Sequence, residues 1–151
     1  KAPNYPDQTA DYGVHEFTYS IYTHQGIYYQ SNLLKHADDL NRKVLKKEIK
    51  DVNNKDKETK QLVNSYLEKI NGNSRIEVIK KPEYQTSGTI IRLYEPYGGK
   101  DQIKFKFNKN IKEAKIVNLI ENETNDNINY DGKVLKLDMG PFEIKTVLVN
   151  F

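Results

Sequence analysis

Three histidines and several nearby carboxylates are the residue types that could hold a metal ion. His15 and His24 lie in the stretch DYGVHEFTYSIYTHQG (residues 11–26), and His36 follows it. A zinc site needs ligands that converge on one point. His15 and His24 are nine residues apart, so on one continuous strand they would point to opposite faces and lie about 30 Å apart. We therefore expect no metal site in this chain and interpret each histidine as a hydrogen-bonded or surface residue.

Paired carboxylates could serve as the acid and the nucleophile of a glycosidase. The nearest pairs are Asp11 with Glu16 and Asp38 with Asp39. Neighbouring acids in a helix point apart and such pairs are common on surfaces, so we interpret both pairs as solvated. The chain also lacks cysteine, a G-x-S-x-G nucleophile elbow and a glycine-rich phosphate loop. We expect no catalytic residue within it.

Composition indicates a soluble, β-rich domain without nucleic-acid or membrane partners. The 151 residues suffice for one ordinary domain, or for a small domain plus part of another. The 24 basic residues are nearly balanced by 21 acidic ones, whereas nucleic-acid binders usually show a stronger and more clustered excess. No apolar run reaches transmembrane length, and the absence of cysteine fits a reducing compartment. Because the first residue is Lys1 and not methionine, we interpret the sequence as a fragment or a processed product.

The elements that must position these residues begin with a predicted strand. Polar and apolar residues alternate from His15 to Thr23, with Phe17, Tyr19 and Ile21 on one face. This period of two predicts a half-buried strand that ends near Gly26.

A short amphipathic helix is predicted next. Ser31 is a suitable N-cap, and apolar residues recur at helical spacing at positions 33, 34, 37 and 40. Residues 42–60 are highly charged and predict a linker or long surface loop, with a strand allowed around residues 44–49.

The remainder of the sequence predicts strands only. They are expected at residues 62–70, 75–81, 88–95, 102–108, 114–121, 133–139 and 142–151. In QIKFKFN (102–108), alternation directs Phe105 and Phe107 to a core and Lys104 and Lys106 to solvent, which argues against a nucleic-acid platform. We therefore predict a mainly β fold, an antiparallel β-sandwich or the related barrel, with one short helix near the N-terminal third.

Three segments carry a resemblance to a known family. The first is GVHEFTYSIYTHQG, followed by Leu40-Asn41; the second is IEVIKKPEYQTSGTIIRLYEPYGG (76–99); the third is GPFEIKTVLV (140–149). In this order they resemble segments of the family 38 glycoside hydrolases, the α-mannosidases, of the bacterial and cytosolic type. Where the family often has Leu-Asn-Pro-Leu, this chain has Leu40-Asn41-Arg42-Lys43, and residues 44–64 match nothing in the pattern.

The resemblance implies that the parent protein is a retaining, zinc-dependent α-mannosidase. Such an enzyme uses an Asp nucleophile and a second carboxylate, with zinc holding sugar hydroxyls. The family carries the nucleophile and most or all zinc ligands in an N-terminal β/α domain, which this chain lacks. The chain alone is therefore expected to be inactive, with no cofactor of its own.

The same resemblance implies a domain division, partners and a location. Residues 1–60 would be the trailing strand and helix of a large central β-sandwich plus a charged linker, and residues 61–151 a C-terminal β-sandwich domain. The expected partners are the catalytic domain of the same polypeptide and its mannoside substrate, and homo-oligomer formation stays open. The expected location is the cytoplasm of a bacterium.

Four residues are candidate sites. Asp11 and His15 are expected near the rim of the parent's active site. Tyr94 and Tyr97 are candidate sugar-stacking residues under the alternative that this chain is a carbohydrate-binding β-sandwich module. A third alternative is weak polyanion binding by the lysines of residues 43–60, for which we prefer a solvated loop.

Overall fold

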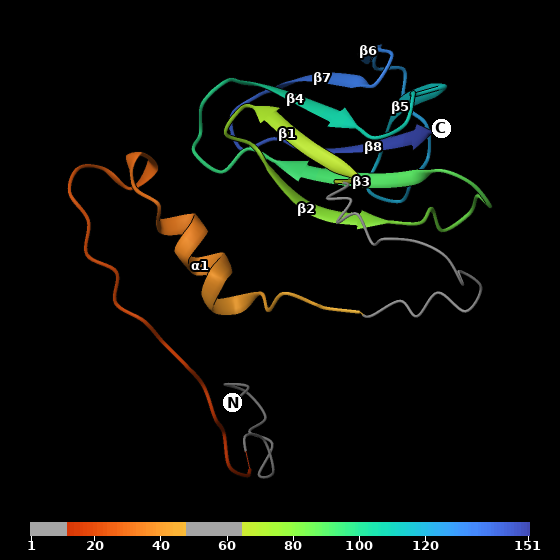
Figure 1. Cartoon of the computed structure of the whole chain (residues 1–151). Helices are drawn as coiled ribbons and strands as arrows, with labels where there is room; N and C mark the ends of the chain where they lie inside the picture. Colours follow the sequence, from red (N-terminus) through yellow and green to blue (C-terminus); the bar gives the residue numbers. More distant parts are fainter. Residues whose placement is uncertain (1–11, 48–64) are drawn as a thin grey trace, which may run out of the picture. The chain divides into compact units, whose positions relative to one another are not determined.

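The computed structural model describes residues 12–47 and 65–151, and Figure 1 traces their path. The chain divides into two units, on either side of residue 50, and each is described by itself. Residues 1–11, much of the predicted charged linker and the first residues of the predicted strand 62–70 lie outside the described residues. The predicted domain boundary at residue 60 also lies there and stays a prediction.

The first unit contains the predicted short helix. A 3-10 turn, η1 (Tyr28–Gln30), precedes helix α1 (Leu33–Asn41). The N-cap position is Asn32, but the capping side chain is that of Ser31, one residue earlier. The Ser31 Oγ accepts the N–H of Leu33 at 3.2 Å and donates to the carbonyl of Tyr28 at 2.6 Å. The hydroxyl thus links the turn to the helix.

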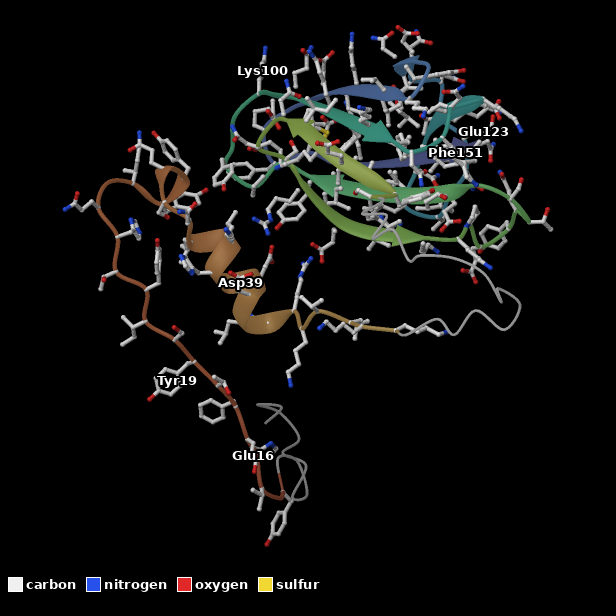
Figure 2. All side chains as sticks on the ribbon, viewed as in Figure 1. Glu16, Tyr19, Asp39, Lys100, Glu123 and Phe151 are labelled. Carbon is white, nitrogen blue, oxygen red and sulfur yellow. The ribbon has the colours of Figure 1, made fainter. Side chains whose placement is uncertain are left out.

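The predicted strand at residues 15–23 is wrong. These residues are extended but form no strand, and Phe17, Tyr19 and Ile21 are 81%, 80% and 86% exposed. Alternation defines two faces, whereas a strand also needs a neighbour for its backbone N–H and C=O groups. None of the described residues supplies that neighbour. Figure 2 shows Glu16 and Tyr19 projecting from this extended segment.

The side of the segment that contacts α1 is the one expected to be polar. The Tyr22 ring lies tilted against His36 of the helix, with ring centroids 4.4 Å apart, and stacks on His24 at 5.9 Å. Residues 44–47, where a strand was allowed, are likewise irregular.

The second unit is an antiparallel β-sandwich, as predicted. Its strands are β1 (Leu67–Asn71), β2 (Arg75–Lys80), β3 (Thr89–Tyr94), β4 (Asp101–Phe107), β5 (Glu113–Val117), β6 (Asn129–Asp131), β7 (Val134–Met139) and β8 (Ile144–Asn150). Sheet A has the order β1-β4-β7-β6 and sheet B the order β2-β3-β8-β5. Several strands that follow one another in sequence therefore lie in different sheets, and β8 pairs with β3 and β5.

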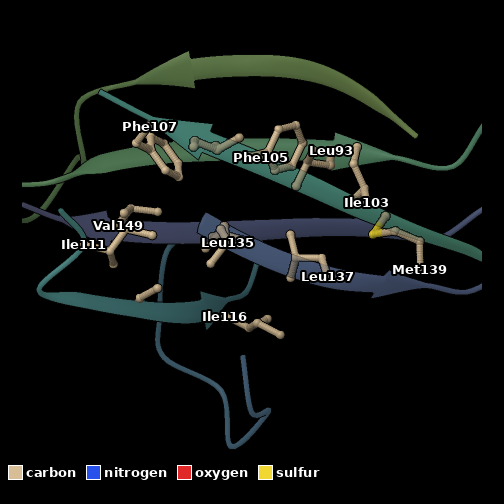
Figure 3. Packing of buried hydrophobic residues seen from close by; sticks show 13 residues of the cluster. Leu93, Ile103, Phe105, Phe107, Ile111, Ile116, Leu135, Leu137, Met139 and Val149 are labelled. Atoms are coloured by element: carbon tan, nitrogen blue, oxygen red, sulfur yellow. The ribbon is translucent and has the colours of Figure 1, made fainter. Parts of the chain in front are cut away.

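The core lies between the two sheets (Figure 3). Phe105 and Leu135 from sheet A meet Leu93 and Val147 from sheet B, and all four are fully buried. Alternate residues of β3, β4, β5, β7 and β8 supply most of this core, which is the origin of the period-two pattern. The prediction for strand 102–108 is confirmed for Phe105 and Phe107, which are buried, and for Lys106, which is exposed, whereas Lys104 is half-buried.

Two parts of the sandwich differ from the prediction. Strand β6 was not predicted, because Asn-Tyr-Asp shows no apolar alternation; it forms as an edge strand by pairing with β7. The predicted strand 114–121 ends at Val117, where the chain turns. Asn118 makes this turn, since its Oδ1 accepts the N–H groups of Ile120 (3.0 Å) and Asn122 (2.9 Å).

The outer face of sheet B carries a second, smaller apolar cluster. Ile90, Val117 and Leu148 are buried there, apart from the main core. They alternate with core residues along their strands and so point away from sheet A. The β2–β3 loop (81–88) and the loop after β5 (118–124) flank this outer cluster and form a pocket above Ile90 and Leu148.

Candidate functional site

The predicted rim residues are placed only in part. His15 lies in the exposed extended segment, and Asp11 lies outside the described residues. Their proposed role at an active-site rim stays a prediction. A small pocket of about 120 Å³ between this segment and α1 is lined by Tyr22 and His36, but not by His15.

Two of the histidines lie beside one tyrosine. The Tyr22 ring contacts both His24 and His36, so two of the three imidazoles share one aromatic neighbour. Even so, no group of three His, Cys, Asp or Glu side chains that could hold a metal ion occurs in residues 12–47 and 65–151.

The predicted sugar-stacking residues, Tyr94 and Tyr97, are half-buried. Tyr94 ends β3, opposite Ile144 of β8. Tyr97 lies in the turn that follows. Their role in stacking stays a prediction.

A buried carboxylate holds that turn in place. Glu95 is 3% exposed, and its carboxylate accepts the backbone N–H groups of Tyr97 (2.8 Å), Gly98 (2.7 Å) and Gly99 (3.2 Å). It also accepts the N–H of Phe142 (3.1 Å), in the β7–β8 turn. One side chain therefore ties two turns together across 47 residues of sequence.

The backbone conformation of the β7–β8 turn accompanies its contact with Glu95 and Gly98. Phe142 has φ 55°, an unusual value for a residue other than glycine, and its ring lies against Gly98. A Cβ on Gly98 would lie 2.6 Å from that ring. The backbone N–H of Glu95 donates to the carbonyl of Glu143 at 2.9 Å, which is a second link between the two turns.

The hydrogen bonds change the acidity of Glu95. Burial alone would raise its pKa, but the four N–H groups of Phe142, Tyr97, Gly98 and Gly99 together hold the pKa below its ordinary value. Glu95 is thus ionised and fully engaged at neutral pH. It is a structural anion and a poor proton donor.

Asp101 plays a matching part at the start of β4. Its Oδ2 accepts the N–H groups of Asn73 (2.8 Å) and Ser74 (2.7 Å) and the Ser74 hydroxyl (2.6 Å). Burial would raise the pKa of Asp101, but the Ser74 hydroxyl and the N–H groups around it lower the pKa overall. This carboxylate fixes the β1–β2 turn and is likewise occupied.

The pocket on the outer face of sheet B has a volume of about 260 Å³. Its floor is Ile90 and Leu148, and its walls are Pro82, Tyr84, Gln85, Glu121, Asn122 and Glu123. The walls come from two loops that are distant in sequence, and Glu123 is labelled in Figure 2.

Glu121 joins these two loops. Its side chain is only 7% exposed; Oε1 pairs with Nζ of Lys80 at 2.6 Å, and Oε2 accepts the N–H of Glu83 at 2.6 Å. Lys80, and then the N–H of Glu83, lower the pKa of Glu121, and Glu121 raises the pKa of Lys80. Glu121 has φ 67°, an unusual value for a residue other than glycine.

Sequence reasoning missed both Glu95 and this pocket. A lone acid directly after a predicted strand, followed by Pro-Tyr-Gly-Gly, could have indicated a turn-capping carboxylate at Glu95. Nothing in the sequence indicates that residues 82–85 and 121–123 meet, because that depends on the order of the strands in sheet B.

The chain is similar to known α-mannosidases along nearly its whole length. It is 30% identical over 150 residues to "Alpha-mannosidase G" of Dictyostelium discoideum, covering 97% of this chain and 13% of that protein. It is 27% and 26% identical over 152 residues to "Alpha-mannosidase 2C1" of Mus musculus and of Homo sapiens, covering 99% of this chain and 14% of each relative. The chain thus spans only about a seventh of the length of these relatives.

Two further findings are negative. No solved structure matches this chain. In the part of the chain that the structure describes, no helix is long and apolar enough to cross a membrane.

A family model identifies the sandwich. Residues 73–147 match the "Glycosyl hydrolases family 38 C-terminal beta sandwich domain", a segment that runs from the turn held by Asp101 into strand β8. It includes Glu95 and every residue that lines the pocket except Leu148. The antiparallel two-sheet architecture agrees with that description. This chain therefore belongs to the C-terminal region of the family 38 glycosyl hydrolases.

Proposed function

We propose that this chain is the C-terminal structural segment of an α-mannosidase whose catalytic residues lie elsewhere in the same polypeptide. The observation that carries the proposal is the family match at residues 73–147, combined with similarity to α-mannosidases that extends over the whole chain but covers only 13–14% of their length. The substrate of the complete protein would be a terminal α-mannoside.

The state of the buried carboxylates supports a structural role. A glycosidase needs one carboxylic acid that can donate a proton and a second carboxylate free to attack or to activate water. Glu95, Asp101 and Glu121 each accept several internal hydrogen bonds or an ion pair, and each has a lowered pKa. They stabilise turns and loops and are unsuited to either catalytic task.

The exposed face of residues 17–21 supports a partner within the same polypeptide. Phe17, Tyr19 and Ile21 form an apolar row on an extended backbone, which is what a strand presents before it joins a sheet. We infer that another part of the polypeptide covers this row, with His15 beside it.

The proposal includes a retaining mechanism and zinc in the complete enzyme. The described residues of this chain do not fit a zinc site, since they contain no suitable group of ligands. The zinc ligands would therefore belong to the catalytic part, and we assign this chain no step of the reaction. A cytoplasmic location is likewise part of the proposal.

Hydrolysis of p-nitrophenyl α-mannoside by the full-length protein tests the proposal. We expect the full-length protein to release p-nitrophenol, to lose activity with a metal chelator and to regain it with zinc. The 151-residue chain should be inactive under the same conditions. Proton NMR of the first product should show α-mannose, as expected of a retaining enzyme.

Three further results would contradict the proposal. The β-mannoside should not be hydrolysed at a comparable rate. Hydrolysis by the 151-residue chain alone would contradict the structural role, and an inactive, zinc-loaded full-length protein would contradict the assigned activity.

A further inference from the structure

We propose that the pocket on the outer face of sheet B binds a single neutral sugar ring. This inference rests on the proposed function only for the choice of a mannoside as the first ligand to test. Its physical basis is the composition, charge and construction of the pocket itself.

The apolar parts of the pocket suit the C–H face of a pyranose. Ile90 and Leu148 form a buried floor, and Pro82 and Tyr84 add two rings to the wall. Tyr84 is 79% exposed, and no structural role of its ring is apparent in the described part of the chain. An exposed tyrosine beside an apolar floor is a suitable stacking platform for a ring with one apolar face.

The polar parts suit hydroxyl groups. The side-chain amides of Gln85 and Asn122 line the pocket, and they make no hydrogen bond to the residues that the structure describes. Each amide can donate and accept, as a sugar hydroxyl can, so the two are complementary. Glu123 adds an acceptor at the rim.

The local charge favours a neutral ligand over an ion. Glu121 is already paired with Lys80 at 2.6 Å, and Glu123 with Lys115 at 2.8 Å. A cation would compete with these lysines, and an anion would meet the glutamates. A metal ion is also disfavoured, because no three potential ligands converge in residues 65–151.

The size and rigidity of the pocket point to one ring. Its volume of about 260 Å³ is just below the roughly 300–1,000 Å³ of pockets that take drug-sized ligands. The loops that form it are held by the Lys80–Glu121 pair and by the bond from Glu83 N–H to Glu121. Glu121 is also one of two residues other than glycine with positive φ among the described residues, and such strain often accompanies a functional site.

The test is an amide NMR titration of the 151-residue chain with methyl α-mannoside. We expect saturable shifts confined to residues 82–85 and 121–123, with a Kd on the order of 1 mM, as a small and open pocket would give. Tyr84→Ala should weaken binding at least tenfold, and Gln85→Ala should weaken it by a smaller factor. Tyr130→Ala is the matched control, since it removes a tyrosine ring from sheet A, and it should leave the Kd unchanged.

The outcomes separate this inference from the proposed function. No saturable shift at about 100-fold the expected Kd, with methyl α-mannoside or with methyl glucoside and galactoside, would overturn the pocket while leaving the mannosidase proposal intact. Shifts centred on Tyr94 and Tyr97 would also overturn it. Saturation by another methyl glycoside but not by the mannoside would support the sugar site and would overturn only the choice of a mannoside as its ligand.

Discussion

Residues 15–23 and strand β4 have the same alternating pattern, yet only β4 is a strand. In β4, Phe105 is fully buried and its backbone pairs with β1 on one side and β7 on the other. In the first unit, Phe17 is 81% exposed and no described strand lies beside it. The difference shows that an alternating pattern gives a segment one apolar face, whereas a strand forms only where neighbouring strands bind its backbone N–H and C=O groups.

The largest effect should come from truncating the paired segment. Phe105→Ala should lower the free energy of unfolding by about 3–5 kcal/mol, because it removes a buried ring between the sheets. Phe17→Ala should change it by less than about 0.5 kcal/mol. Urea unfolding followed by tyrosine fluorescence measures both. Equal losses for the two variants would show that residues 15–23 are packed within this chain.

A smaller effect should follow from adding one methyl group where backbone approaches backbone. Gly72 has φ 95°, and a Cβ there would lie 2.8 Å from Cα of Ile103 in β4. Gly72→Ala should cost about 2–4 kcal/mol from strain and overpacking. Gly99→Ala is the matched control, since a Cβ there has nothing within 4 Å. Unfolding midpoints of both variants equal to that of the unchanged chain would contradict the close approach of Gly72 to β4.

The Glu95 carboxylate should make the sandwich sensitive to acid. Its pKa in the folded state lies below 4.5, the ordinary value for a glutamate. Its stabilising contribution is therefore complete above about pH 4.5 and is lost as the pH falls through the lower, folded-state pKa.

Glu95→Gln tests this dependence. The variant should lose about 1–3 kcal/mol at pH 7, because four N–H donors lose a charged acceptor. Its stability should also fall less steeply than that of the unchanged chain between pH 5 and 3. Urea midpoints across that range measure the slope, and parallel curves for the two proteins would contradict the assignment.

The smallest effect should come from the helix cap in the first unit. Ser31→Ala removes the acceptor of the Leu33 N–H and should cost the helix about 1 kcal/mol. Amide exchange in the first turn of α1 should then be about fivefold faster, as about 1.4 kcal/mol corresponds to tenfold. Exchange in β3 and β8 should not change. Exchange that becomes faster in β3 and β8 as well would count against the separation into two units.

Much of the sandwich follows from residue pattern alone. Alternation in Ile103, Phe105 and Phe107 identifies both the strand and its buried face, because side-chain period and burial are local consequences of the extended backbone. The helix follows from its apolar spacing and Ser31 for the same reason. The motif resemblance adds the family, which composition could not supply.

The remaining features depend on contacts between distant residues. The pairing of β3 with β8, the bond from Phe142 N–H to Glu95 and the junction of Lys80 with Glu121 each join segments about 40 to 60 residues apart. Strand β6 has no pattern of its own and depends on β7. The false strand at residues 15–23 is the converse case, in which a local pattern is present and the partner is not.

The position of β8 in sheet B has a consequence for synthesis. Ile90 of β3 pairs with Leu148 of β8, and 148 − 90 is 58 residues. At about 5–20 residues per second, a ribosome takes roughly 3–12 s to cover that interval. Until then β2 can pair with one edge of TIIRLY, but the edge that faces β8 stays unpaired and open to association with neighbouring nascent chains. A chaperone that covers the free edge of β3 would therefore be needed only for these seconds, until β8 has been synthesised and pairs with β3.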